Sequence, residues 1–490
     1  MNMESHDGYR RWSASWSGDD CSVELRSEGD LQFNADATEI QSISQGGYFE
    51  VNERKGATLR QVRITPSGNG LQYVYTINGK QEPFEGEVKT WFASFLLALE
   101  RSTGFAADAR VPKLMAKGGP AAVLDEINNL TGDHVRGIYF RKLLEQPNLP
   151  APIVIRTITQ AGNQIESDYE LARVLMEVSR QYELPDEASR TAFLNAIAKL
   201  KSDYEHARVL IVLLNRPNIS ADQVKLALNS AAGIKSDYEK SRILLSLMGQ
   251  KSFDQASLDF YLKLAGTINS DYEKSRDLLA PLERYTLTPD QRSLVMDNAT
   301  KMNSDYEKSR LLTSLAAKSK FDEKQMNGYL KVLESMKSDH ERSQSLLALM
   351  QNNTLTSASL NQALLATAKA HNDYEKSRVL NLLVTSKFDE AQINEYLNVV
   401  DSMTADHERS RCLIALLEHS KLSDAALGKV LDAAGRIRAD FDKSRVLQAI
   451  AQKYPLQGAL RESYIKVAES IGNEYERNRA LAGVVRRGSL

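Results

Sequence analysis

The sequence predicts a mainly α protein, in which a right-handed α-solenoid of about ten 34-residue αα-hairpins follows a small antiparallel β domain. Three observations lead to this fold class. The string SDYEKSRV, or a close variant, occurs ten times at intervals of 33 to 35 residues. Each interval has room for two helices and two short turns, but not for a strand as well. The first 85 residues lack the repeat and alternate between apolar and polar side chains instead.

The acid that opens each copy marks the period of the repeat. These acids are Asp168, Asp203, Asp237, Asp271, Asp305, Asp339, Asp373, Asp406, Asp440 and Glu474. A weaker copy begins 35 residues upstream, at Asp133. A repeat of this length is one supersecondary unit that cannot bury its apolar face alone. Stacked copies can bury it, so we expect the repeats to form a continuous array.

Each copy opens with the start signal of a helix. Ser236 is followed three residues later by Glu239, the spacing of a capping box in which each side chain accepts a free backbone N–H. The acids of the first turn also suit the positive end of the helix dipole. Apolar residues then recur at helical spacing, at Ile243, Leu244, Leu247 and Met248. This pattern predicts a first helix, helix A, of about 14 residues.

A second start signal follows a short polar break. The spacing of a cap residue and a glutamine recurs at Ser220/Gln223, Thr288/Gln291, Asp322/Gln325 and Asp389/Gln392. An apolar stripe after it consists of Leu258, Tyr261, Leu262 and Ala265 in one copy. The pattern predicts a second helix, helix B, which completes the hairpin.

Six positions recur at the start of helix A, and we number them as slots. Slot one is the opening acid, slot two is aromatic or histidine, slot three is acidic, slot four is mostly basic, slot five is small and slot six is almost always arginine. We expect slot two to pack against the neighbouring repeat and slot five to allow close approach of helices. The slot-six arginine lies three residues after the slot-three acid, within reach for an ion pair; the slot-one acid of an adjacent repeat is the other candidate partner.

The ladder of slots is therefore predicted to be structural. Its members in three central copies are Asp237, Tyr238, Glu239, Arg242, Asp271, Tyr272, Glu273, Arg276, Asp305, Tyr306, Glu307 and Arg310. Identical segments solve the same packing problem in every copy, so we expect specific binding where the copies differ. The turns between helices A and B differ most, and the candidate binding residues there are Asn215, Arg216, Asn218, Gln250, Lys251, Gln351 and Asn352.

Residues 1–85 are predicted to form the β domain, with five to seven short antiparallel strands. Leu71, Tyr73, Tyr75 and Ile77 alternate with other residues, and Asn69-Gly70 and Asn78-Gly79 are tight-turn signals. Trp12 and Trp16 are expected to pack in or beside this sheet.

Residues 86–131 are predicted to form a helical adaptor that shields the first repeat, and residues 132–490 the solenoid. An apolar helical face runs from Val88 to Leu99 and Gly104 ends it. Two further short helices, 111–117 and 120–129, are separated by Gly118-Gly119.

Composition and motifs exclude several functions. The net charge is −2, because acids balance the slot-four and slot-six bases; we expect a solvated, self-compensating face and no nucleic-acid partner. No apolar run is long enough to span a membrane. No phosphate-binding glycine loop, zinc motif or nucleophile elbow is present. The sequence therefore predicts no enzyme, no cofactor and no metal site.

The array resembles the broad α-solenoid group of HEAT-like and tetratricopeptide-like repeats, without the Trp, Leu-Gly and Pro positions of the tetratricopeptide motif. More closely, the chain is similar to uncharacterised bacterial proteins in which a β-rich N-terminal part, here GGYFEVNERKG, precedes SDYE-type repeats. In that group such regions can be secreted or tethered behind a membrane signalling module. The resemblance implies no catalytic residues.

Three functions are considered, of which the third, an RNA-binding array, is disfavoured by the balanced charge. The first is a non-catalytic protein-interaction scaffold that uses the solenoid surface to bind a protein or peptide. The alternative is the ligand- or peptide-sensing region of a bacterial envelope signalling protein. The N-terminus has no signal-peptide pattern, which predicts a cytoplasmic protein as the sequence is written; a periplasmic or extracellular location is the alternative if the chain is part of a longer one.

Overall fold

The computed structural model describes residues 2–487, apart from residues 7, 8, 18–20, 35, 69, 218, 249, 251 and 252. The chain divides into two units, Met1–Glu239 and Lys240–Leu490. The boundary lies inside helix α9 (Asp237–Leu247).

The first unit begins with an antiparallel sheet of seven strands in the order β1-β2-β3-β6-β7-β8-β9. These strands are β1 (Asn2–His6), β2 (Tyr9–Ser17), β3 (Cys21–Glu28), β6 (Tyr48–Lys55), β7 (Thr58–Ser67), β8 (Gly70–Ile77) and β9 (Lys80–Glu82). Strands β4 (Leu31–Phe33) and β5 (Ile40–Ile43) form a separate hairpin. The register aligns Leu25, Val51, Val62 and Tyr75 across four neighbouring strands. All four are buried, so one face of the sheet lies on a core, and the predicted β domain is confirmed.

Helix α1 (Glu87–Thr103) supplies the other side of that core. Phe92, Leu96 and Leu99 are buried with the sheet residues, as the apolar helical face predicted. The helix ends at Gly104, whose φ of 66° is left-handed and favours glycine. The predicted turn at Asn78-Gly79 joins β8 and β9, with positive φ at both residues. The side chains of Trp12 and Trp16 lie outside the part of the chain that the structure describes.

Helix α2 (Ala107–Ile127) ties the β domain to the repeats. Its backbone is non-helical at Gly118 and Gly119, which confirms the predicted break. Arg110 donates to the carbonyl of Asp36 at 2.8 Å and Lys113 to that of Phe33 at 2.5 Å. The helix also packs against α3 and α4. That it shields the first repeat stays a prediction.

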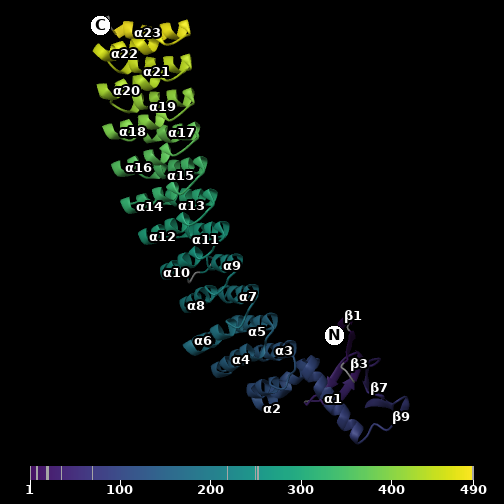
Figure 1. The fold of residues 1–490 in the computed structure, drawn as a ribbon. Coiled ribbons are helices and arrows are strands. Elements are labelled where there is room, and N and C mark those ends of the chain that lie inside the picture. Colours follow the sequence, from purple (N-terminus) through teal and green to yellow (C-terminus); the bar gives the residue numbers. More distant parts are fainter. Residues whose placement is uncertain are drawn as a thin grey trace. The chain divides into compact units, whose positions relative to one another are not determined.

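The repeats are αα-hairpins throughout the described residues, and Figure 1 shows them stacked within each unit. The first unit holds α3 (Asp133–Leu144), α4 (Ala151–Gln164), α5 (Asp168–Gln181), α6 (Glu187–Ile197), α7 (Asp203–Leu214) and α8 (Ala221–Ala231). The second holds α10 (Gln255–Gly266), α11 (Asp271–Arg284), α12 (Pro289–Thr300), α13 (Asp305–Lys318), α14 (Glu323–Glu334), α15 (Asp339–Asn352), α16 (Ser357–Ala368), α17 (Asp373–Leu383), α18 (Glu390–Asp401), α19 (Asp406–His419), α20 (Asp424–Gly435), α21 (Asp440–Lys453), α22 (Gly458–Glu469) and α23 (Glu474–Arg487).

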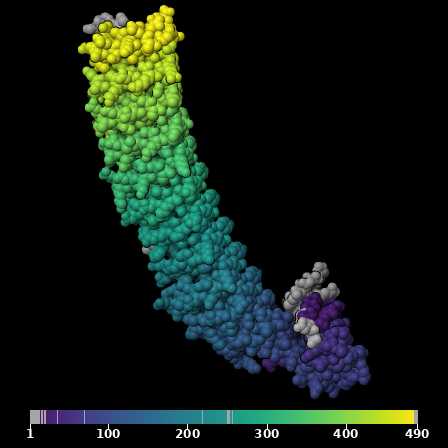
Figure 2. Space-filling model, viewed as in Figure 1, coloured from purple at the N-terminus to yellow at the C-terminus, as the bar shows by residue number. Residues whose placement is uncertain are grey.

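Helices of like kind form the two layers of the array. Within each unit, a helix A packs against the next helix A, as α11 does on α13, and a helix B packs against the next helix B, as α12 does on α14. In Figure 2 the hairpins of the second unit follow one another as bands without gaps. The mainly α solenoid is confirmed, while its right-handed sense stays a prediction. Among the described residues, no helix is both long and apolar enough to cross a membrane.

The caps of helix B are as the sequence predicted. In α8, α12, α14 and α18 the cap side chain accepts from the glutamine N–H, and the glutamine side chain accepts from the cap N–H. The stripe residues Leu258, Tyr261, Leu262 and Ala265 are fully buried.

Candidate functional site

The slot-one aspartate joins each repeat to the next. Oδ2 of Asp305 accepts the backbone N–H groups of Lys337 and Ser338, both at 2.7 Å. These N–H groups start the next helix A and have no partner within it. Two successive N–H groups, 31–34 residues further on, donate in the same way to Asp133, Asp168, Asp203, Asp271, Asp339, Asp373, Asp406 and Asp440.

This bond corrects the predicted capping box of helix A. Ser338 does accept from the N–H of Glu341, at 3.3 Å. The reciprocal half is wrong, because the Ser338 N–H donates to Asp305 of the preceding repeat and not to Glu341. The slot-three acid is thereby left for other partners.

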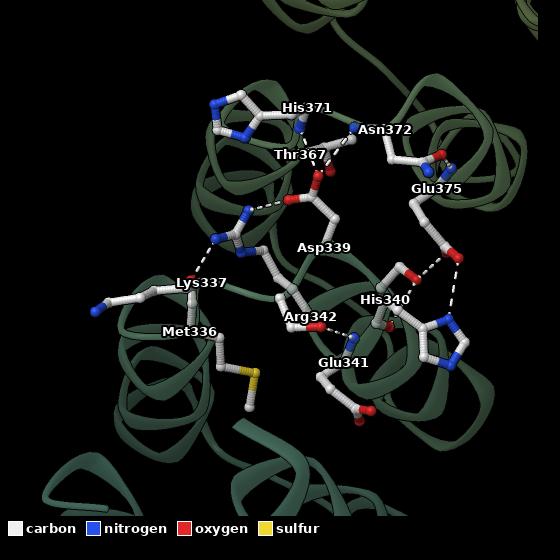
Figure 3. A network of polar contacts seen from close by, with 12 residues as sticks. Met336, Lys337, Asp339, His340, Glu341, Arg342, Thr367, His371, Asn372 and Glu375 are labelled. Atoms are coloured by element: carbon white, nitrogen blue, oxygen red, sulfur yellow. Dashed lines mark hydrogen bonds and ion pairs between the residues drawn. The ribbon is translucent and has the colours of Figure 1, made fainter. Parts of the chain in front are cut away.

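The slot-three acid receives hydrogen bonds from two repeats. Glu375 accepts from Arg378 of its own helix at 2.8 Å. It also contacts two residues of the preceding repeat, the Ser343 hydroxyl and His340 at 3.1 Å (Figure 3). Burial alone would raise the pKa of Glu375, but Ser343, His340 and Arg378 outweigh it and lower the pKa. The small slot-five serine of one other repeat makes the same contact, because the Ser377 hydroxyl donates to Glu408.

The slot-six arginine pairs with the slot-three acid of its own helix, the first of the two predicted partners. The N–O distances are 2.5–4.0 Å for Arg173–Glu170, Arg208–Glu205, Arg276–Glu273, Arg310–Glu307, Arg378–Glu375, Arg411–Glu408, Arg445–Asp442 and Arg479–Glu476. The acids are 7–13% exposed and the arginines 24–39%.

Six slot-four bases are buried, so the prediction of a solvated face is wrong for them: Lys240, Lys274, Lys308, Arg342, Lys376 and Lys443. Lys308 is 3% exposed and donates to the hydroxyl of Ser335 at 3.0 Å and to its carbonyl at 3.3 Å. Ser335 ends helix α14, where a cation suits the negative end of the helix dipole. Lys376 and Lys443 reach the corresponding serines, Ser402 and Ser470.

The slot-two aromatic side chains face solvent, which corrects the prediction that they pack against the neighbouring repeat. Tyr272 and Tyr306 are 55% and 59% exposed. The slot-six guanidinium of the same helix lies over each ring, 5.7 Å from the centroid of Tyr272 and 5.8 Å from that of Tyr306. Slots two and six are four residues apart and share one helix face. That face is exposed to solvent.

We call this row of rings and arginines the aromatic edge. In the first unit its rings are Tyr169, Tyr204 and Tyr238; in the second they are Tyr272, Tyr306, Tyr374, Phe441 and Tyr475. Each ring is 51–69% exposed. Histidines replace the ring at His340 and His407 and contact the slot-three acid of the next repeat.

The turns between helices A and B carry a second structural ladder. Arg216 donates to the carbonyl of Tyr182, 34 residues earlier, at 2.5 Å. Lys318 donates to Leu282 at 3.0 Å in the same way. Bases at the end of one helix A thus cover free carbonyls at the end of the preceding one.

The predicted binding residues lie at this turn edge. Asn215 caps α7, Gln351 and Asn352 end α15, and Gln250 donates to the carbonyl of Ser246. Asn218 and Lys251 lie outside the described residues. That these turns bind a partner stays a prediction.

Helix B carries a recurrent buried tyrosine that the sequence pattern did not single out. Tyr261, Tyr329, Tyr396 and Tyr464 are fully buried, and each hydroxyl donates to a carbonyl 16 residues further on, at 2.7–2.9 Å. The signal was present, because these tyrosines recur in every second copy.

Two buried carboxylic acids also depart from the repeat pattern. Asp277 takes an apolar position of helix α11, where its Oδ1 accepts the Ser241 hydroxyl at 2.7 Å. Glu100 of α1 accepts the Tyr139 hydroxyl at 2.5 Å and the Ala106 N–H at 2.6 Å. Burial raises the pKa of each to about 7. Both sit inside the packing of the helices.

Two observations bear on metal binding and thiol chemistry in the described residues. No group of three or more His, Cys, Asp or Glu side chains there could hold a metal ion. Burial raises the pKa of the Cys412 thiol to about 12, so it stays protonated at neutral pH.

The chain is similar to solved structures at low sequence identity. No family model and no curated protein matches it. A solved structure of a Kap121p mutant is 12% identical with a TM-score of 0.35, and the match covers 82% of this chain and 48% of that one. This chain thus spans about half the length of that relative. A circular tandem repeat protein is 13% identical with a TM-score of 0.13, covering 82% and 78% of the two chains. A computationally designed cyclic homooligomer is 10% identical with a TM-score of 0.09, covering 75% and 98%.

Proposed function

We propose that the chain is a non-catalytic protein-interaction scaffold whose solenoid surface binds a protein or peptide. The aromatic edge carries this proposal. It is a row of half-exposed rings at the same position of successive repeats, and an arginine lies over seven of them. Tyrosine and arginine are enriched at the centres of protein interfaces. The stacked guanidinium holds each ring in place, which lowers the entropy lost on binding.

The repetition favours binding over catalysis. An active site needs one unique constellation in a pocket, whereas the aromatic edge presents the same groups again and again. A row of equivalent contacts instead suits an extended partner that touches several repeats at once, because each further contact is made at high effective concentration. In this proposal residues 132–490 carry the binding surface, residues 1–85 form a separate β domain and residues 86–131 connect them.

One observation supports the alternative of a ligand- or peptide-sensing region. The face of the sheet away from α1 is hollowed by a depression of about 500 Å³, lined by Ser22, Glu24, Asn52, Arg54 and Gln61 among others. These polar side chains could hydrogen-bond a small polar ligand.

Alanine variants of the two edges test the scaffold. Tyr272→Ala combined with Tyr306→Ala removes rings from the aromatic edge, and Gln351→Ala with Asn352→Ala alters the turn edge. Partners captured by the unaltered chain from the source proteome would be compared across both variants. We expect loss only with the tyrosine variant, and protection from hydrogen exchange at the aromatic edge. Loss of partners only with the turn variant would place binding at the turns. If the unaltered chain captured no specific partner, the scaffold proposal would be refuted.

A further inference from the structure

We propose that the aromatic edge of the first unit, at Tyr169, Tyr204 and Tyr238, binds a proline-rich segment in the polyproline II conformation that runs across the repeats. This inference rests on the proposed function and names the class of its partner. The three rings belong to consecutive repeats and are 51%, 52% and 57% exposed.

The spacing that helix packing gives to the rings matches the pitch of the ligand. Asp168 binds the start of α7 through Ser202 at 2.6 Å, and Asp203 binds the start of α9 through Ser236 at 2.7 Å. Slot two therefore sits at equivalent places on neighbouring helices, and packed helices lie roughly 8–10 Å apart. A polyproline II helix advances about 9 Å in each turn of three residues. One face of such a segment can thus set a residue against each ring.

The hydrogen-bonding groups of this edge complement the same ligand. Arg173 and Arg208 lie over the rings of Tyr169 and Tyr204, at 5.4 and 5.6 Å from the centroids. Together with the phenol hydroxyls they offer N–H and O–H donors. The acids beside them are mostly buried, since the side chains of Glu170 and Glu205 are 7% and 10% exposed. A proline-rich segment has solvated carbonyls to accept from these donors, and its prolines have no N–H that needs an acceptor.

The charges argue against a nucleic acid on the same surface. Aromatic rings with arginines also bind single strands, but that binding draws on uncompensated positive charge. Here the guanidinium of Arg208 is 2.8 Å from the carboxylate of Glu205, and Arg173 is 3.7 Å from that of Glu170. The field around the edge is therefore weak, and short-range contacts to rings and carbonyls dominate.

Fluorescence anisotropy with the full chain tests the proposal. The probes are a labelled peptide of about nine prolines, a glycine-serine peptide of the same length, and a single-stranded oligonucleotide. We expect the proline peptide to bind at least about tenfold more tightly than the glycine-serine peptide, with little dependence on salt. We expect Tyr169→Ala with Tyr204→Ala to weaken it by about tenfold or more.

Two control variants separate the edge from general effects. Phe260→Ala removes an exposed ring, 49% exposed, from helix α10 and should leave binding unchanged. Tyr204→Phe keeps the ring and loses only the hydroxyl, so its effect should be smaller than that of Tyr204→Ala. Melting temperatures of all variants would show that they are folded.

Several results would overturn the proposal. One is equal affinity for the proline and glycine-serine peptides. Another is a loss of affinity with Phe260→Ala as large as that with the tyrosine variant. The third is salt-dependent binding of the oligonucleotide without binding of the proline peptide. If the proline peptide fails while captured proteins still depend on the tyrosines, the scaffold stands and the ligand class is wrong. If neither peptides nor captured proteins depend on the tyrosines, both proposals fall.

Discussion

Replacing Asp277 with asparagine should stabilise the second unit at neutral and alkaline pH. Asp277 is fully buried in helix α11, at a position where the other copies carry mostly Val, Ile, Leu or another small or apolar residue. Its Oδ1 accepts from Ser241, while its Oδ2 has no hydrogen-bond partner among the described residues. Asparagine has nearly the same shape and can still accept from Ser241.

The magnitude follows from the pKa. Burial raises the pKa of Asp277 from 3.8 to about 7, against the lowering by Ser241 and Arg276. At roughly 1.4 kcal/mol for each pKa unit, ionisation costs roughly 4 kcal/mol more in the folded chain than in the unfolded one. The cost is absent below about pH 4, where both states are protonated. Stability then falls as the pH rises from about 4 to about 7, because the folded state keeps a proton that the unfolded state has released.

The variant should lose this pH dependence. Its amide still leaves one buried group without a partner, at about 1–2 kcal/mol, so the net gain above pH 7 is about 2–3 kcal/mol. Hydrogen exchange of α11 and α13 amides at pH 5 and pH 8 would measure it locally, with melting temperatures alongside. Asp290→Asn, an exposed acid of the next helix, is the control. An unchanged difference between the two pH values in Asp277→Asn would refute the reasoning.

Three further variants probe the repeat. Asp305→Ala frees two backbone N–H groups and should lower the unfolding free energy by about 1–3 kcal/mol in chemical denaturation; no loss would mean that water replaces the carboxylate. Tyr261→Phe should cost more than Tyr329→Phe in the same assay, by about 1 kcal/mol, because Pro281 has no N–H for the carbonyl that Tyr261 binds; equal costs would contradict this. Tyr306→Ala should cost less than about 1 kcal/mol, and a larger loss would show that the exposed ring supports the packing.

Much of the fold could be predicted because the signals are local. The 34-residue period and the caps of helix B depend on residues three or four apart, such as Thr288 and Gln291, whose reciprocal bonds the structure shows. Gly118-Gly119 and Gly104 likewise end helices through their own backbone conformation. Such signals need no knowledge of how one repeat lies on the next.

The site could not be predicted as well, because it depends on contacts between repeats. Asp305 and Glu341 are equally plausible acceptors for the Ser338 N–H until the neighbouring helix is in place. In the following repeat Asp339 takes the equivalent N–H, that of Asn372, so Glu375 is free to bind the slot-six arginine and the preceding repeat. Burial of Lys308 against the end of helix α14 depends on the same placement. Composition alone therefore suggested a solvated charged face.

Packing within the chain does not require an aromatic ring at slot two. Slots one, three, four and five contact neighbouring elements through Asp305, Glu375, Lys308 and Ser309 or their equivalents, and their residue types follow from those contacts. Slot two is more than half exposed, where a polar residue would serve folding as well as tyrosine. Stacking of an exposed arginine on such a ring stabilises by only about 0.5–1 kcal/mol, yet eight of the ten copies carry Tyr or Phe there. A contact made outside the chain accounts for these rings better than stability does, and this is why we place the binding surface on the invariant edge of the repeat.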